Sequence, residues 1–395
     1  MSDIKIIYIL LKFLQIFSMF ALSFWVAKSK NDKVYWKRSI GLILIWALVD
    51  GLRFARDQDY NSYYPRFELM ASGNNPDEYE YLFYLICRLF GLLSLPYWTF
   101  IFVGSTILII TCLWLFKDYR KYLPFIIILM FWDLGQYDNL IRFYWAFPFF
   151  ALSVYYRIKG KILLSFILIF CAVNIHSSYW IVVPVIVFYG ILNKEVFSPK
   201  ICVVIYLAVL LLGSLDSLSF IAKYANYLDI LGVDKISNYA DQADMIVSGN
   251  FGYNAGNERD RGLSTIIRLV LAYAPSILWG KDSIKKYNGG IFMYNIFIIG
   301  AITMPLFQLV EILDRLNSLF LFFSCIVTGN WIGTVLHNRQ KLKFKILLVC
   351  WLCLISSVWP SFSSLFHRSK DQYMLFLWDA NGRQYIPTNI YPMFD

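Results

Sequence analysis

Long apolar runs, separated by short charged segments, follow one another along the chain from residue 4 to residue 360. A helix needs about 20 apolar residues to cross the hydrocarbon core of a bilayer. The pattern therefore predicts an all-α polytopic integral membrane protein with about 12 transmembrane helices. We expect these spans at residues 4–27, 39–52, 97–116, 121–132, 143–156, 162–175, 179–192, 201–216, 263–279, 290–307, 316–335 and 345–360.

The apolar stretch 81–95 differs from these runs, because it contains Arg88 and Gly91 and follows an acidic segment. A helix of this kind is typical of the membrane interface. We therefore expect an interfacial helix here and not a full span.

The predicted spans leave few residues for a soluble domain. We expect residues 1–360 to form a single polytopic membrane domain, and residues 361–395 to form an extracytoplasmic C-terminal tail. Two outer loops, 53–96 and 217–262, are long enough to contribute to a site. The second is rich in Asn, Asp, Gly and Tyr, which is typical of a surface loop.

The distribution of Lys and Arg gives the orientation. With the N-terminus outside, six short inner loops hold 20 of the 36 basic residues, as the positive-inside rule requires. Counting 81–95 as a full span would move five of these six clusters to the outside, which supports the interfacial interpretation. The inner loops are 28–38, 117–121, 157–161, 193–200, 281–286 and 337–345.

Composition agrees with a membrane protein, with 59% hydrophobic and 16% charged residues, against about 25% charged in ordinary globular domains. The net charge of +10 follows from the basic loops between the spans, so we expect no nucleic acid as a partner. Cys350 and Cys353 have CxxC spacing without a second pair or histidine partners. We therefore expect no metal site.

The densest polar cluster, Asp50 to Tyr64, follows the second predicted span. It contains Arg53, Arg56, Asp59, Tyr60 and Tyr63. Guanidinium groups bind phosphate, carboxylates bind hydroxyls, and rings stack on sugar faces. The segment is typical of a sugar-phosphate site, although a solvated loop with local ion pairs would have the same composition.

Two further polar groups fall on the same predicted side. Arg142 opens a span after Asp133 and Asp138, and it either snorkels to headgroups or contributes to a site. His176 lies between two spans in the sequence Asn-Ile-His-Ser-Ser. Imidazole can accept a proton from a hydroxyl, but a lone histidine is also a common structural residue.

The last polar group consists of Gln308, Glu311, Asp314 and Arg315. Residues 308, 311 and 315 share one face of a helix, and Glu311 with Arg315 could form a purely structural ion pair. All four polar groups fall on the outer side. We therefore expect one outward-facing cavity in which several arginines bind an anionic, membrane-bound substrate.

These residues resemble the EpsG-type branch of the Wzy polysaccharide polymerases, which join repeat units of O-antigen and exopolysaccharide in bacteria. Where family members often have Gly before the Asp-Tyr pair, this chain has Asp57 and Gln58. The resemblance is carried by Arg53, Asp59-Tyr60-x-x-Tyr63, Glu78 or Glu80 before the helix of 81–95, Arg142 with Ala146, Ala172-x-x-x-His176-x-Ser178, and Arg315.

The resemblance implies a membrane-embedded, metal-independent glycosyltransferase with a GT-C-like architecture and no cofactor. It would polymerise undecaprenyl-diphosphate-linked repeat units on the periplasmic face of the bacterial inner membrane. Its partners would be the lipid-linked glycan donor and acceptor and membrane lipids. A chain-length regulator could be a further partner.

Under this resemblance, Arg142 and Arg315 are the candidates for binding the diphosphate, with assistance from Arg53. His176 or Asp59 is the candidate base. The other candidate substrate-binding residues are Arg56, Tyr60, Tyr63 and Glu311. Two alternatives stay open: a lipid-linked oligosaccharide flippase or other transporter, which the lack of an internal repeat disfavours, and an O-antigen ligase.

Overall fold

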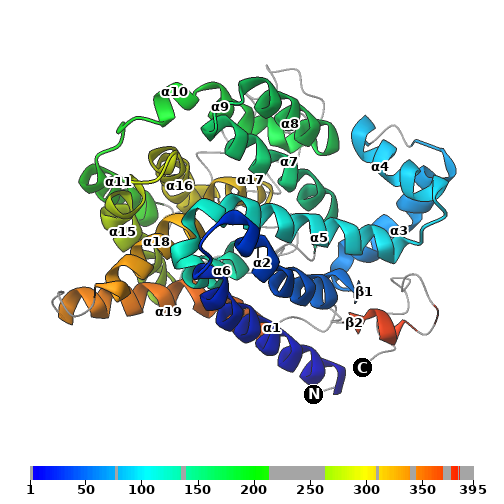
Figure 1. Cartoon of the computed structure of the whole chain (residues 1–395), viewed down its shortest axis with the longest axis horizontal. Coiled ribbons are helices and arrows are strands. Elements are labelled where there is room, and N and C mark those ends of the chain that lie inside the picture. The colour runs from blue at the N-terminus through cyan, green and yellow to red at the C-terminus, as the bar shows by residue number, and fades with distance from the viewer. Residues whose placement is uncertain are drawn as a thin grey trace. The chain divides into compact units, whose positions relative to one another are not determined.

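A computed structural model describes residues 3–75, 79–134, 139–212, 263–307, 311–338, 344–367, 375–380 and 382. Within these residues the chain is almost entirely helical (Figure 1). It separates into two compact units, Met1–Gly190 with Val358–Asp395, and Ile191–Ser357. The predicted loop 217–262 lies outside the described residues.

Five helical segments of the described chain are long and apolar enough to cross a membrane: Ile6–Ala27, Tyr97–Phe131, Leu263–Ile284, Gly290–Phe307 and Leu313–His337. Shorter apolar helices accompany them. The prediction of an all-α, multi-pass membrane protein is therefore confirmed, while the number of about 12 spans stays a prediction.

The first unit is built on helices that pack both with their neighbours in sequence and with more distant helices. α1 packs against α2 and α6, α5 packs against α7, and α7 packs against α8. Its helices are α1 (Asp3–Ala27), α2 (Asp32–Trp46), α3 (Asp57–Ser72), α4 (Tyr81–Leu92), α5 (Tyr97–Phe116), α6 (Leu123–Asp133), α7 (Ile141–Ile158), α8 (Ile162–Ile175), α9 (Val183–Val187) and the start of α10 (Tyr189–Leu192). It also contains the π-helical turn η1 (Ala47–Gly51) and the 3-10 helices η2 (Lys117–Tyr122), η3 (Ser177–Val182) and η6 (Leu377–Asp379).

A small antiparallel sheet joins two distant parts of this unit. β1 (Arg53–Phe54) pairs with β2 (Leu375–Phe376), so that Arg53 lies opposite Phe376. The Leu377 N–H donates to the Leu52 carbonyl at 2.8 Å. The predicted C-terminal tail is therefore attached to the segment that follows η1.

Segment 53–80, predicted as an outer loop, contains a helix. α3 follows β1 and ends at Gly73, whose φ of +104° is the left-handed conformation that suits glycine at a helix C-terminus. α3 packs against α4 (Figure 1). The Arg88 Nη1 donates to the Ala71 carbonyl at 2.6 Å, and a side chain at Gly91 would collide with the Ala71 backbone.

One predicted span is interrupted. In place of 179–192, the chain forms η3, α9 and the four-residue α10, with Pro184 in the first turn of α9. Hydropathy alone does not register such a break, because the residues on both sides of it are equally apolar. The predicted span 316–335 lies inside the segment Leu313–His337, which consists of α17 (Glu311–Leu321) and α18 (Ser324–His337).

Ion pairs join the loops that were predicted to share the inner side. Asp32 binds Lys117 at 2.9 Å and Arg120 at 2.7 Å, and hydrogen bonds from both hold the pKa of Asp32 below its usual value. Lys159 binds Asp118 at 2.7 Å. These contacts lie beyond the C-terminal end of α7, whereas Arg142 lies at its N-terminal end.

The second unit contains α11 (Pro199–Leu212), α15 (Leu263–Ile284), α16 (Gly290–Phe307), α17, α18 and most of α19 (Phe344–His367). Its predicted inner loops also meet, because Lys281 binds Glu195 at 2.7 Å. α16 packs closely on α17, where the Asn317 Nδ2 donates to the Gly300 carbonyl at 3.2 Å.

Candidate functional site

A half-buried polar cluster lies at the first turn of α7. The Arg142 Nη1 binds the Glu80 Oε2 at 2.5 Å, and the two side chains are only 15% and 13% exposed. The Glu80 Oε1 accepts the Ser177 N–H at 2.9 Å. One carboxylate therefore joins the start of α4, the start of α7 and the segment after α8.

The charge state of Glu80 follows from these contacts. Burial raises the pKa of Glu80, but the Arg142 charge and the Ser177 N–H lower it by more, so that the pKa lies below its ordinary value. Glu80 is therefore a carboxylate at neutral pH, and Arg142 has an anionic partner in this structure.

His176 lies directly after α8, in extended backbone. Its Nδ1 lies 2.5 Å from the Ser178 Oγ and accepts the Ser178 N–H at 3.3 Å. Its ring meets Phe143 edge to face at 5.6 Å. An Nδ1 that accepts leaves the proton of a neutral imidazole on Nε2, so the ring is oriented by its neighbours.

Aromatic rings and a second arginine surround Arg142. Its Cζ lies 5.0 Å from the ring centre of Tyr79, and Tyr79 and Tyr63 lie 6.3 Å apart. The Arg66 Cζ lies 5.8 Å from the ring of Tyr63. Burial raises the pKa of Tyr63 to about 12, so this phenol is neutral and can donate or accept a hydrogen bond.

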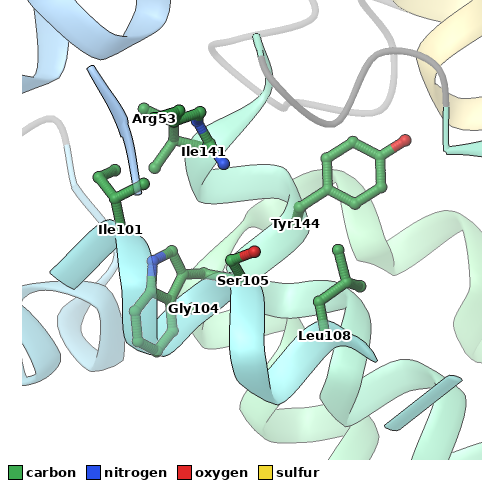
Figure 2. A pocket seen from close by; sticks show the side chains of 8 residues that line it. Arg53, Ile101, Gly104, Ser105, Leu108, Ile141 and Tyr144 are labelled. Atoms are coloured by element: carbon green, nitrogen blue, oxygen red, sulfur yellow. The ribbon is translucent and has the colours of Figure 1, made fainter. Parts of the chain in front are cut away.

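A recess adjoins this cluster (Figure 2). Arg53 enters it from β1, and Ser105 and Tyr144 add hydroxyl groups from α5 and α7. Because Ile141 lines the recess and Arg142 follows it, the first turn of α7 contributes to both the recess and the ion pair. The lining residues are Arg53, Ile101, Gly104, Ser105, Leu108, Ile141, Tyr144 and Trp145.

Arg53 and Arg56 have different surroundings. The Arg53 Nη1 donates to the Asp50 carbonyl at 3.0 Å, and the residue is 3% exposed. The Arg56 side chain is fully buried and lies 3.3 Å from the Asp50 carboxylate. Arg53 therefore borders the recess, whereas Arg56 lies inside a buried ion-pair network.

The other predicted residues of α3 are also placed. The Asp59 N–H donates to the Asn139 Oδ1 at 3.4 Å, which connects α3 to the segment before α7. Tyr60 is 1% exposed, and its ring packs 5.0 Å from that of Tyr97. Tyr60 is thus a packing residue between α3 and α5 in this structure.

Arg315 and Glu311 belong to the second unit, on α17. Arg315 is half-buried, and its carbonyl accepts the Ser318 hydroxyl at 2.6 Å. The side chain of Glu311 lies outside the described residues, so its pairing with Arg315 stays a prediction. Asp138, Gln308 and Glu78 lie outside them as well.

The sequence interpretation brought together Arg142, His176 and Tyr63 but assigned no role to Glu80, Tyr79 or Arg66. Glu80 directly precedes an amphipathic helix, where an anion interacts favourably with the helix dipole. The position of Glu80 before this helix was therefore a signal in the sequence that the residue has a role. The ion pair with Arg142 was not visible in the sequence, because 62 residues separate the two.

A known protein family matches most of the chain. The sequence model described as the EpsG family matches residues 35–375. No curated protein and no solved structure matches the chain. The match includes the Glu80–Arg142 pair, His176 and Arg315.

Proposed function

Because the chain belongs to the EpsG family, a family of Wzy-like polymerases, we propose that it polymerises undecaprenyl-diphosphate-linked oligosaccharide repeat units. The product would be O-antigen or a related surface polysaccharide. The reaction would take place on the periplasmic face of the bacterial inner membrane, in a GT-C-like glycosyltransferase.

The observation that carries the proposal is the half-buried cluster of Glu80, Arg142 and His176 beside the Arg53 recess. An oriented imidazole, two guanidinium groups and tyrosine rings are the groups that a diphosphate-linked sugar needs. Their common location at one end of α7, opposite the basic loops, supports an extracytoplasmic site.

The reaction is a substitution at the anomeric carbon of the donor. An acceptor hydroxyl forms a bond to this carbon while the bond to the phosphate oxygen breaks, and the electron pair leaves with the lipid diphosphate. The hydroxyl proton passes to a base, for which His176 and Asp59 are the candidates. On His176 the accepting atom is Nδ1, which then gives up its hydrogen bonds from Ser178. Arg142 and Arg53 stabilise the charge that develops on the leaving diphosphate, without a metal ion. Arg315 stays a candidate for the same role from the sequence.

In the absence of substrate, the Glu80 carboxylate is the ion-pair partner of Arg142. A diphosphate that reaches Arg142 must replace the Glu80 carboxylate, so donor binding exchanges one anion for another. Tyr63 and Tyr79 line the path of the sugar beside Arg142. Arg56 and Tyr60 would contribute only indirectly, since both are buried. Glu311 stays a candidate substrate-binding residue.

The proposal is tested by reconstituting the purified protein in liposomes with a lipid-linked repeat unit. Wild type should form a ladder of polymer, and Arg142→Ala and Arg315→Ala should abolish it. Arg38→Ala, on a half-buried arginine beside Trp25, serves as the control and should retain the ladder. If both variants polymerise like wild type, the site is misplaced.

The same vesicles separate the alternatives. Movement of the intact lipid-linked unit between leaflets without new glycosidic bonds would indicate a flippase. Transfer of a single unit to a lipid core without lengthening would indicate a ligase. Either outcome rejects the polymerase.

A further inference from the structure

The C-terminal strand β2 covers the segment that carries Arg53. Arg53 lies opposite Phe376, and Phe54 lies opposite Leu375. The family match ends at residue 375, so Phe376 lies immediately beyond it. Phe376 is 1% exposed, whereas the ring that stacks on it, Trp378, is 59% exposed.

Phe376 contacts the buried arginine of this region. The Arg56 Cζ lies 4.5 Å from the ring centre of Phe376 and 5.1 Å from that of Tyr8. The Arg56 guanidinium is thus held between two aromatic faces, an arrangement that is favourable for a desolvated cation. Without Phe376, one face of this buried charge would lose its cover.

Arg56 in turn holds the end of η1. Its Nη2 donates to the Val49 carbonyl at 2.7 Å, and its Nη1 lies 3.3 Å from the Asp50 Oδ1. Lys12 and Gln15 of α1 bind the same carboxylate. The fully buried Asp50 is therefore fixed by three side chains from two segments.

Asp50 connects this network to the recess. Its carbonyl accepts the Arg53 Nη1 at 3.0 Å, and Arg53 lines the recess (Figure 2). Between the two arginines, Ala55 has a φ of 49°. A side chain rarely adopts this conformation unless its surroundings impose it, and Ala55 is fully buried.

We propose that Phe376 is a positioning residue for Arg53. By pairing with β1 and covering Arg56, the C-terminal strand fixes both the backbone and the guanidinium of Arg53 at the recess. The inference rests on the proposed function, in which Arg53 binds the lipid diphosphate.

The test measures binding of undecaprenyl diphosphate, the carrier without sugar, to the full chain in nanodiscs. Polymerisation of a lipid-linked repeat is measured on the same samples. Phe376→Ala should weaken carrier binding by about tenfold, because a shift of about 1 Å in a binding group has effects of this order or larger. Phe376→Tyr, which keeps the ring, should stay within about twofold of wild type.

A double-mutant cycle separates positioning from general loss of structure. If Phe376 acts through Arg53, Phe376→Ala should add nothing to the loss caused by Arg53→Ala. Trp351→Ala, which removes an exposed ring, should bind like wild type. If Phe376→Ala does not fold, Phe376→Leu carries the test, since it keeps apolar volume without the aromatic face.

The outcomes are distinct. Unchanged carrier binding in Phe376→Ala, or losses that add to those of Arg53→Ala, overturns the positioning role. Carrier binding that follows the expected pattern in a wild type that does not polymerise rejects the polymerase and leaves the positioning role standing. A wild type that does not bind the carrier overturns both.

Discussion

The Glu80 carboxylate binds the Arg142 guanidinium at 2.5 Å and also accepts the Ser177 N–H. Through these two contacts, one carboxylate connects α4, α7 and the segment after α8. It makes Glu80 an organising residue of the candidate site.

The Glu80–Arg142 pair should contribute measurably to stability. A double-mutant cycle with Glu80→Gln and Arg142→Gln should give a coupling of about 1–3 kcal/mol in thermal unfolding, because the pair is largely buried and hydrogen-bonded. The exposed Asp118–Lys159 pair is the matched control, for which about 0–1 kcal/mol is expected. Equal couplings for the two pairs would contradict this prediction.

The same pair predicts that the stability of the folded protein depends on pH. The folded pKa of Glu80 lies below the ordinary value of 4.5, so its stabilising contribution is complete above that value. The contribution is lost as the pH falls through the folded pKa.

The difference in Tm between wild type and Glu80→Gln should therefore be constant from about pH 5 to 7 and shrink below about pH 4.5. Asp32, whose pKa is also lowered, is present in both proteins, so its titration affects both alike. A Tm difference that narrows between pH 5 and 7 would show that the Glu80 pKa is not lowered.

Substitution by asparagine tests the two candidate bases. In His176→Asn, the new amide oxygen can still accept the Ser178 N–H that His176 Nδ1 accepts. Loss of the base should lower kcat by about 10²–10⁴-fold without unfolding the protein. Asp59→Asn, measured in parallel, should be nearly unchanged if His176 is the base, and the reverse pattern would assign the role to Asp59.

Gly104 provides a test of the recess. A Cβ at this position would lie 2.7 Å from the Trp145 Cε2, so Gly104→Ala must displace the indole that lines the recess. We expect a loss of about 1–3 kcal/mol in stability and weaker donor binding. At Gly190 a Cβ meets nothing within 4 Å, so Gly190→Ala is the control. If the two variants lose stability and donor binding to the same extent, crowding of the recess is not the cause.

Three apolar helices were predicted to the residue, whereas the bounds of α7 and α15 differ from the predicted spans by up to five residues. The expected spans 97–116, 162–175 and 290–307 have the bounds of α5, α8 and α16. Hydropathy and charge define such helices directly, because the membrane requires a minimum apolar length.

Features that depend on tertiary contacts were not predictable in this way. α3 lies in a segment of mixed polarity, and its helix is supported by packing against α4, Tyr97 and Phe100. The roles of Glu80 and Phe376 depend on partners far away in the chain. No local pattern specifies such a partner, and the location of the site on one side of the membrane stays a prediction.

The pairing of β1 with β2 has a consequence for biosynthesis. Arg53 is made long before its strand partner, Phe376. The helices between them must therefore enter the membrane with the Arg56–Asp50 network still uncovered on one side. The Arg53 segment acquires its final conformation only after Phe376 has been made, so a chain that stops before Phe376 cannot carry a finished site.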